Sequence, residues 1–145
     1  MKTSAIIPER IKLNHIEVVS TYINDDTINK NLNFEFNVAH NTKHNLDDER
    51  IKIELFINLL STKEIGIKYH IDFYFQIEDL KDHYELDQDK NIPIFSGQFI
   101  ATLLGISFST ARGIIYQQLQ ETNFCKLILP VVSPSKILDL RIKNS

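Results

Sequence analysis

The chain has 145 residues, 43% of them hydrophobic, and a formal net charge of -3 at pH 7. This length predicts one domain spanning residues 1 to 145, with a core of its own. The absence of a cluster of Lys and Arg in the sequence argues against nucleic acid as a partner. A single cysteine, Cys125, excludes an internal disulfide and fits a reducing compartment, so we expect a cytoplasmic protein.

The N-terminal stretch lacks the pattern of a targeting segment. Only the short apolar run from Ala5 to Ile7 precedes Pro8 and Glu9, and a signal peptide needs a longer apolar core. No apolar run in the sequence approaches the length of a membrane span. We therefore expect a soluble protein that is not inserted in a membrane.

The first half of the sequence predicts an antiparallel sheet. Apolar residues at alternate positions, with one change of phase that a bulge would explain, predict a first strand over residues 11–18. Residues 20–31 are mostly polar and are typical of a connection. Alternation then predicts strands at 32–38, 51–60 and 67–77, joined by polar turns. Such a meander has one apolar face and one face in water.

The second half of the sequence predicts helix. Residues 79–91 are charged and aperiodic, which indicates a solvated loop or a short exposed helix. Apolar residues three or four apart over 97–119 predict a long helix, and Gly105 suggests that it consists of two pieces, the second starting at Ser107 or Ser109. The predicted class is α+β, a four-stranded antiparallel sheet followed by a long helix and a short C-terminal helix or tail.

The apolar stripe of the long helix is wider than one small sheet needs. Its main face repeats at the helical period and comprises Ile100, Leu104, Phe108, Ala111, Ile115 and Leu119. Either a second copy of the chain covers the surplus or the surplus binds something apolar. We expect this face to form the interface of a homo-oligomer, most simply of four chains.

One stretch of the sequence resembles the main helix and following turn of the SecB family of bacterial export chaperones. The residues that carry the resemblance are Ala111, Arg112, Phe124, Leu127, Leu129, Ile137 and Leu138. A weaker resemblance extends over residues 10–138. It implies an ATP-independent holdase that binds unfolded preproteins along apolar grooves and keeps them competent for export.

The resemblance also suggests where such a groove would lie. Its candidate walls are apolar residues around the long helix and in the connection after the first strand: Tyr22, Ile23, Ile28, Phe99, Leu103, Phe124 and Val131. Some SecB-like proteins instead guard the antitoxin of a toxin-antitoxin pair, so an antitoxin is the alternative client. A module that binds a small apolar ligand is the alternative from another class, and it would enclose one closed pocket.

Acidic residues fall on the polar phase of the predicted strands. Glu35, Glu54, Asp72 and Glu78 are therefore expected to share the solvent face of the sheet. In SecB proteins that face is acidic and docks the export motor SecA, so the resemblance implies a partner-docking surface here. The alternative is an ordinary solvated face, on which Lys52 and Lys68 dilute the acidic charge.

No residue pattern points clearly to catalysis. His40 and His44, near Asp47, have a spacing that could hold a metal, but we interpret them as part of a solvated turn. His70 beside Asp72 is interpreted as a surface pair, and Cys125 as a packed thiol. The sequence has neither a glycine-rich phosphate loop nor a nucleophile elbow. We expect no enzyme activity, no metal and no cofactor.

Overall fold

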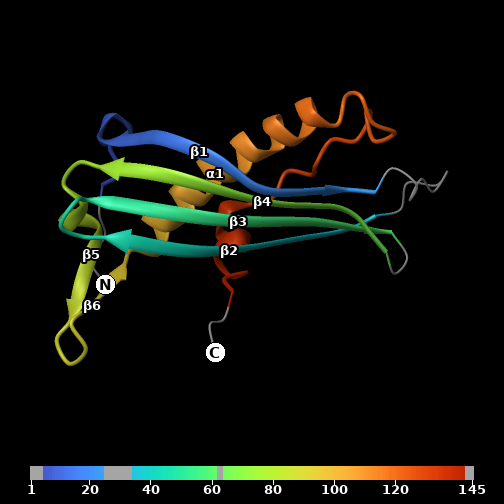
Figure 1. Ribbon diagram of the computed structural model, residues 1–145. Helices are drawn as coiled ribbons and strands as arrows, with labels where there is room; N and C mark the ends of the chain where they lie inside the picture. Colours follow the sequence, from blue (N-terminus) through green and yellow to red (C-terminus); the bar gives the residue numbers. More distant parts are fainter. Residues whose placement is uncertain (1–4, 25–33, 62–63, 143–145) are drawn as a thin grey trace.

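The protein, a computed structural model, is described over residues 5–24, 34–61 and 64–142. Four strands form an antiparallel sheet in the order β1-β4-β3-β2: β1 (Ile11–Ile23), β2 (Glu35–Asn45), β3 (Arg50–Ser61) and β4 (Glu64–Ile77). A long helix, α1 (Gly97–Gln118), lies across one face of this sheet and leaves the other face open (Figure 1). The predicted α+β class is confirmed.

The core lies between α1 and the sheet. Alternate residues of the two central strands, such as Ile53 and Leu55 on β3 and Ile71 and Phe73 on β4, are fully buried. The side chains between them belong to the open face. The alternation read from the sequence therefore assigns both faces of β3 and β4 correctly.

Strand β1 is longer than the sequence predicted. Its register against β4 shifts between Leu13 and His15, which confirms the expected bulge, and shifts again between Val18 and Ser20. This second irregularity hides the alternation beyond residue 18, so the prediction that residues 20–23 belong to a connection is wrong. The strand continues until Ile23 pairs with Ile67.

Strand β2 also extends further than its apolar residues suggest. The polar run from His40 to Asn45 was predicted as a turn, but it pairs with β3 until Asn45 lies opposite Arg50. The turn is confined to residues 46–49 and closes with Glu49 at a φ of 54°. Of the inward-facing polar residues of this strand, His40 is buried, and its side chain bonds to Leu138 of the C-terminal segment rather than to α1.

The charged stretch after β4 is not a solvated loop. It forms a 3₁₀ turn, η2 (Leu80–His83), and then two short paired strands, β5 (Tyr84–Asp87) and β6 (Ile92–Phe95). Buried Leu80 anchors the turn, and the ring of His83 stacks on Phe99 of α1 at 4.2 Å. The β5–β6 hairpin projects beyond the end of the sheet (Figure 1).

Helix α1 is continuous, contrary to the prediction of two pieces. Ser96 caps its N-terminus by accepting a hydrogen bond from the backbone N–H of Phe99. Ser107 lies inside the helix, where its hydroxyl donates to the carbonyl of Leu103 at 2.8 Å. Gly105 serves packing rather than termination, because a Cβ there would lie 3.1 Å from Cγ of Pro134.

The C-terminal segment packs along the edge of β2. A short helix, α2 (Pro134–Leu138), confirms one of the two predicted forms of this segment. Beyond it, the carbonyl of Leu140 accepts from the N–H of His40, and the N–H of Ile142 donates to the carbonyl of His40 at 2.8 Å. The described end of the chain thus adds a short parallel bridge to the sheet.

Helix α1 has the length and composition of a candidate membrane span, with 22 residues and a mean hydropathy of 1.4 over an 18-residue window. The expectation that no apolar run approaches that length is therefore wrong for this helix. Its apolar side chains have an ordinary explanation, because those that face the sheet make up one wall of the core.

Candidate client-binding groove

The apolar face of α1 is buried within a single chain. The residues predicted to form an oligomer interface are all between 0 and 7% exposed: Ile100, Leu104, Phe108, Ala111, Ile115 and Leu119. They face the sheet of their own chain and cannot touch a second copy in this conformation, so this assignment is corrected. The sequence does not reveal how much of a helix stripe a twisted sheet covers.

The residues predicted to line a client groove divide into two groups. Phe99, Leu103 and Phe124 are at most 2% exposed and belong to the core, which removes them from any surface groove. Tyr22, at 50%, and Val131, at 83%, are open to solvent. Ile23 is half-buried, and Ile28 lies outside the described residues.

A groove of about 360 Å³ lies beside the edge of β2. Its walls come from four elements that are far apart in the sequence: β2, β6, the start of α1 and the C-terminal segment. The lining residues are His40, Thr42, His44, Ile92, Pro93, Ile94, Phe95, Gly97, Ile100, Leu138 and Arg141. Most of them are apolar, and the polar ones come mainly from β2.

The outer edge of the β2 backbone faces this groove, and part of it has no hydrogen-bond partner among the described residues. His40 directs its N–H and C=O away from β3, toward Leu140 and Ile142. Residues two apart in a strand point their backbone groups the same way. Thr42 and His44 therefore also present an N–H and a C=O at this edge, and no backbone group in the described part of the chain pairs with them.

Two side-chain atoms in the groove have no hydrogen-bond partner among the described residues. They are Nδ1 of His40 and Oγ1 of Thr42, both buried. Because Nε2 of His40 lies 3.0 Å from the carbonyl oxygen of Leu138, it must donate, which leaves Nδ1 as an acceptor. Burial lowers the pKa of His40, outweighing the hydrogen bond to Leu138, and the charge of Arg141 lowers it further.

The hairpin supplies exposed apolar side chains next to the groove. Leu86 on β5 and Ile92 and Ile94 on β6 are between 48 and 51% exposed. Exposed apolar groups beside unpaired strand backbone are typical of a site for an extended peptide. The sequence analysis missed these residues, although the alternation of Ile92 and Ile94 after a polar turn is a hairpin signal.

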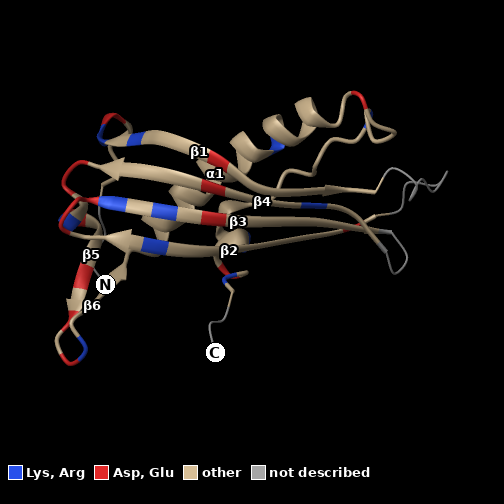
Figure 2. Ribbon diagram, in the orientation of Figure 1, with Lys and Arg blue, Asp and Glu red and all other residues tan. Residues whose placement is uncertain are grey.

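The open face of the sheet does not present the acidic surface that was expected. Glu54 and Asp72 do lie there as cross-strand neighbours, but they are only 9% and 3% exposed. Glu35 is exposed on this face, whereas Glu78 lies beyond the end of β4. Acidic residues gather in the turns at one end of the sheet, and basic residues stand on the strands next to them (Figure 2).

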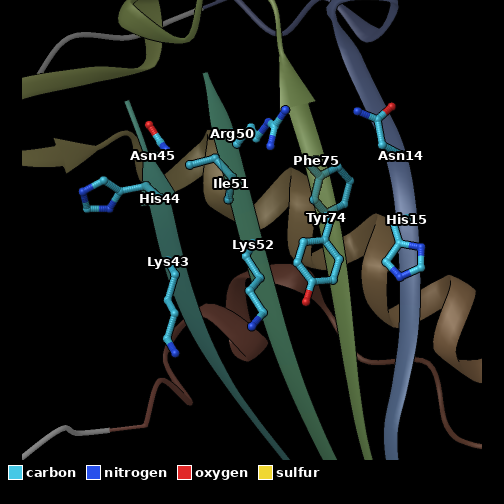
Figure 3. A pocket seen from close by; sticks show the side chains of 10 residues that line it. All are labelled: Asn14, His15, Lys43, His44, Asn45, Arg50, Ile51, Lys52, Tyr74 and Phe75. Carbon is cyan, nitrogen blue, oxygen red and sulfur yellow. The ribbon is translucent and has the colours of Figure 1, made fainter. Parts of the chain in front are cut away.

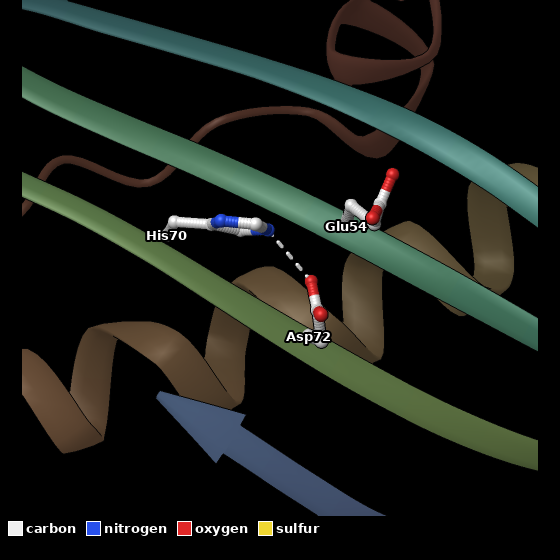
Figure 4. Close-up of side chains that lie close together, drawn as sticks. All are labelled: Glu54, His70 and Asp72. Atoms are coloured by element: carbon white, nitrogen blue, oxygen red, sulfur yellow. Dashed lines mark hydrogen bonds and ion pairs between the residues drawn. The ribbon is translucent and has the colours of Figure 1, made fainter. Parts of the chain in front are cut away.

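The two buried carboxylates belong to an ion-pair cluster. Nζ of Lys52 lies 3.4 Å from Glu54 and 3.3 Å from Asp72. Figure 4 shows the contact between Nε2 of His70 and Asp72, at 2.8 Å, with Glu54 beside it. Asn41 also donates to Glu54 at 2.9 Å. Lysine side chains thus neutralise Glu54 and Asp72, which the sequence analysis had expected to be exposed to solvent.

The same cluster could be mistaken for a metal site. Glu54, His70 and Asp72 bring three potential ligand atoms within 4.8 Å of one another. Burial alone would raise the pKa of Glu54, but the hydrogen bond from Asn41 and the charges of the lysines outweigh it and lower the pKa overall. The ammonium of Lys52 already bridges both carboxylates, so we interpret the group as a structural ion-pair cluster.

Comparison with known proteins finds similarity only at the level of structure. No protein-family model and no curated protein sequence matches this chain. The solved structure of the Mycobacterium tuberculosis Rv1957 SecB-like chaperone, in complex with a ChAD peptide from the Rv1956 HigA1 antitoxin, is similar with a TM-score of 0.59 and 10% identity. The match covers 86% of this chain and 91% of that one. A Streptococcus agalactiae protein of unknown function reaches a TM-score of only 0.40 at 8% identity, over 84% of this chain and 96% of its own, which is too low to support an argument. The chain therefore has a SecB-like fold.

Proposed function

We propose that this chain is an ATP-independent chaperone that holds an extended segment of a client polypeptide in the groove beside β2. The observation that carries the proposal is the coincidence of free strand backbone at Thr42 and His44 with exposed apolar side chains on the hairpin. Backbone pairing binds an extended chain without reading its sequence, and shallow apolar walls tolerate many side chains. Both properties suit a holdase.

The SecB-like fold supports a polypeptide client. We propose one chaperone domain over residues 1 to 145, working in the cytoplasm without catalysis or a cofactor. The half-buried, unpaired Cys125 is compatible with a reducing compartment. Unfolded preproteins remain the proposed clients, while docking of the SecA motor loses the support of an exposed acidic sheet face.

An antitoxin is the second candidate client. It is favoured by a specific observation, because the similar Rv1957 chaperone was solved with a peptide from an antitoxin. Binding of an unfolded preprotein and of an antitoxin-derived peptide, compared at equal concentrations, distinguishes the two clients.

The test of the proposed function uses aggregation of an unfolded client, followed by light scattering. Wild-type protein is expected to suppress aggregation without ATP, and Ile94→Asp is expected to lose most of the effect, because a carboxylate in an apolar groove opposes burial of client side chains. Ile65→Asp is the matched control. Ile65 is 40% exposed, like Ile94 at 48%, but lies at the start of β4.

A second variant addresses the strand edge. The N–H of Thr42 points away from β3, so Thr42→Pro removes a group offered to the client without removing a bond of the sheet. We expect weaker client binding with unchanged far-ultraviolet circular dichroism. If wild-type protein fails to suppress aggregation, or if Ile94→Asp and Thr42→Pro both suppress it fully, the groove is not the client site.

A further inference from the structure

A second groove, of about 440 Å³, lies on the open face of the sheet, opposite α1. It lies near the β2–β3 turn and draws on all four strands (Figure 3). Its principal side chains are His15 of β1, Lys43 of β2, Arg50 and Lys52 of β3, and Tyr74 of β4. Its lining contains no Asp or Glu.

Buried carboxylates hold two of the cations in place. Nζ of Lys43 lies 3.5 Å from Glu54, and Nζ of Lys52 lies between Glu54 and Asp72. The carboxylates sit low in the sheet surface, with side chains 12% and 4% exposed, whereas Lys43 is 59% exposed. The surface therefore shows ammonium groups and hides most of the acid that orients them.

Arg50 adds a cation that is not engaged in the described part of the chain. No ion pair joins its guanidinium to any described carboxylate, and the residue is exposed. A guanidinium is weakly hydrated and forms two parallel hydrogen bonds to a carboxylate. It is the group in this groove best suited to receive an anion from solution.

Aromatic side chains form the floor beside these cations. The rings of Tyr74 and His15 lie 5.4 Å apart, and Nζ of Lys52 lies 5.4 Å from the centre of the Tyr74 ring. Flat rings offer contact area to a neighbouring side chain at little entropic cost. The groove thus combines charge with apolar contact, which favours a polypeptide segment over a free inorganic ion.

The groove is bounded by negative charge on two sides. Glu17 lies opposite Asp72, and Asp72 opposite Glu54, so one row of acids crosses the sheet next to the groove. Asp47 and Asp48 occupy the β2–β3 turn at its other end. Figure 2 shows the basic positions of β2 and β3 between these two acidic borders. Glu54 and Asp72 are buried and paired with lysines, so the exposed acids at these borders are Glu17, Asp47 and Asp48. A long polyanion would meet their repulsion on both sides, whereas one or two carboxylates would not.

We propose that this groove binds a short acidic segment of a partner protein. One or two carboxylates lie against Arg50, Lys43 and Lys52, and an adjoining side chain packs on Tyr74. The site lies on the open face of the sheet, whereas the client groove faces the edge of β2 and the hairpin, and His44 is the lining residue common to both. This proposal places an acidic partner on the open face of the sheet, whereas the sequence analysis expected that face to be acidic and therefore to bind a basic partner.

The test is a titration of isotope-labelled full-length protein followed by amide resonances. The probes are three end-blocked peptides that each carry one phenylalanine, flanked by glutamates, by glutamines or by lysines. We expect only the glutamate peptide to shift the resonances of the groove strands, with an affinity that falls as salt is added. Arg50→Glu should weaken this binding about tenfold, as expected for reversal of a charge in direct contact with the ligand.

Lys68→Glu is the matched control, because it makes the same change of charge on the same face beyond the acidic row. Lys68 pairs with Tyr22 rather than with a groove residue. The affinity of the Lys68→Glu variant for the glutamate peptide should stay within about twofold of wild type. Equal binding of the glutamine or lysine peptide, equal loss in both variants, or tighter binding of a short single-stranded oligonucleotide would overturn the proposal. None of these results depends on whether the chain suppresses aggregation.

Discussion

Individual polar residues in this chain take their roles from cross-strand neighbours. Glu54 and Asp72 alternate with apolar residues, and that pattern assigned them correctly to the face opposite α1. It did not indicate that Lys52 would bridge them or that both would be nearly buried. Which side chain lies opposite another depends on strand register, and sequence alternation leaves register open.

His40 provides a prediction at this scale. Its pKa in the folded chain is lowered below its ordinary value of 6.5, chiefly by burial, so the folded state resists protonation more than the unfolded state. The unfolded state therefore binds more protons as the pH falls through 6.5, and the free energy of unfolding decreases. The loss starts near the unfolded pKa and levels off below the folded one.

The measurement is urea denaturation at several pH values between 8 and 5. His40→Gln can keep a donor near the carbonyl of Leu138 but cannot titrate, so its stability should fall less over the same interval. An identical decrease in wild type and variant would show that His40 does not contribute to the pH dependence. The docked C-terminal segment should release first, because its bridge to β2 is made at His40 itself.

At the scale of elements, two of the three glycines of α1, Gly105 and Gly113, have different surroundings. A Cβ at Gly113 would have no neighbour within 4 Å, whereas a Cβ at Gly105 would approach Cγ of Pro134 at 3.1 Å. Gly105 therefore allows α2 to pack closely on α1. The sequence indicated a helix break at Gly105 because glycine lowers helix propensity, but tertiary packing overrides that local preference.

These glycines give a matched pair of variants. Gly113→Ala should raise the free energy of unfolding by about 1 kcal/mol, because alanine restricts the unfolded chain and favours helix. Gly105→Ala gains the same propensity but must move the ring of Pro134, so we expect no net gain. Chemical denaturation of both variants is the measurement. Equal stabilisation would mean that α2 does not pack on Gly105 in solution.

At the scale of the whole molecule, assembly remains a prediction. The face of α1 that points away from the sheet has an open groove of about 630 Å³ lined only by uncharged residues: Gln98, Ala101, Thr102, Gly105, Ile106, Ser109, Thr110 and Pro134. The one charged residue of the helix, Arg112, is engaged with the carbonyl of Leu129. Small side chains let a second helix approach closely, so we now expect a second copy of the chain on this outer face.

Mass measured by light scattering tests assembly. We expect an oligomer, most simply of four chains, which Ile106→Asp dissociates because it places a carboxylate in a buried contact. Ile106 is 36% exposed within one chain, so the variant should still fold. Ile128→Asp, at a position 64% exposed in the segment after α1, should leave the mass unchanged. A wild-type monomer at micromolar concentration would contradict the prediction.

The sequence by itself determined the elements whose residues repeat with a clear period. Alternation placed β3, β4 and their two faces, and the helical repeat placed α1 and the side of it that is apolar. Both patterns can be read locally, because a strand or helix that buries one face needs the same spacing of apolar residues whichever element covers that face. The resemblance to SecB proteins, carried by residues of α1 and the following turn, indicated a fold that the structure confirms.

Only the tertiary structure decided which surfaces remain free. The stripe from Ile100 to Leu119 is covered by its own sheet, and the C-terminal segment buries His40 while its described part makes no backbone bond to Thr42. The groove beside β2 joins residues about a hundred positions apart, and the groove on the open face joins four strands through their register. A local pattern states that a face is apolar or polar. Which part of the chain covers that face depends on contacts distant in sequence, because burial is a property of the packed molecule.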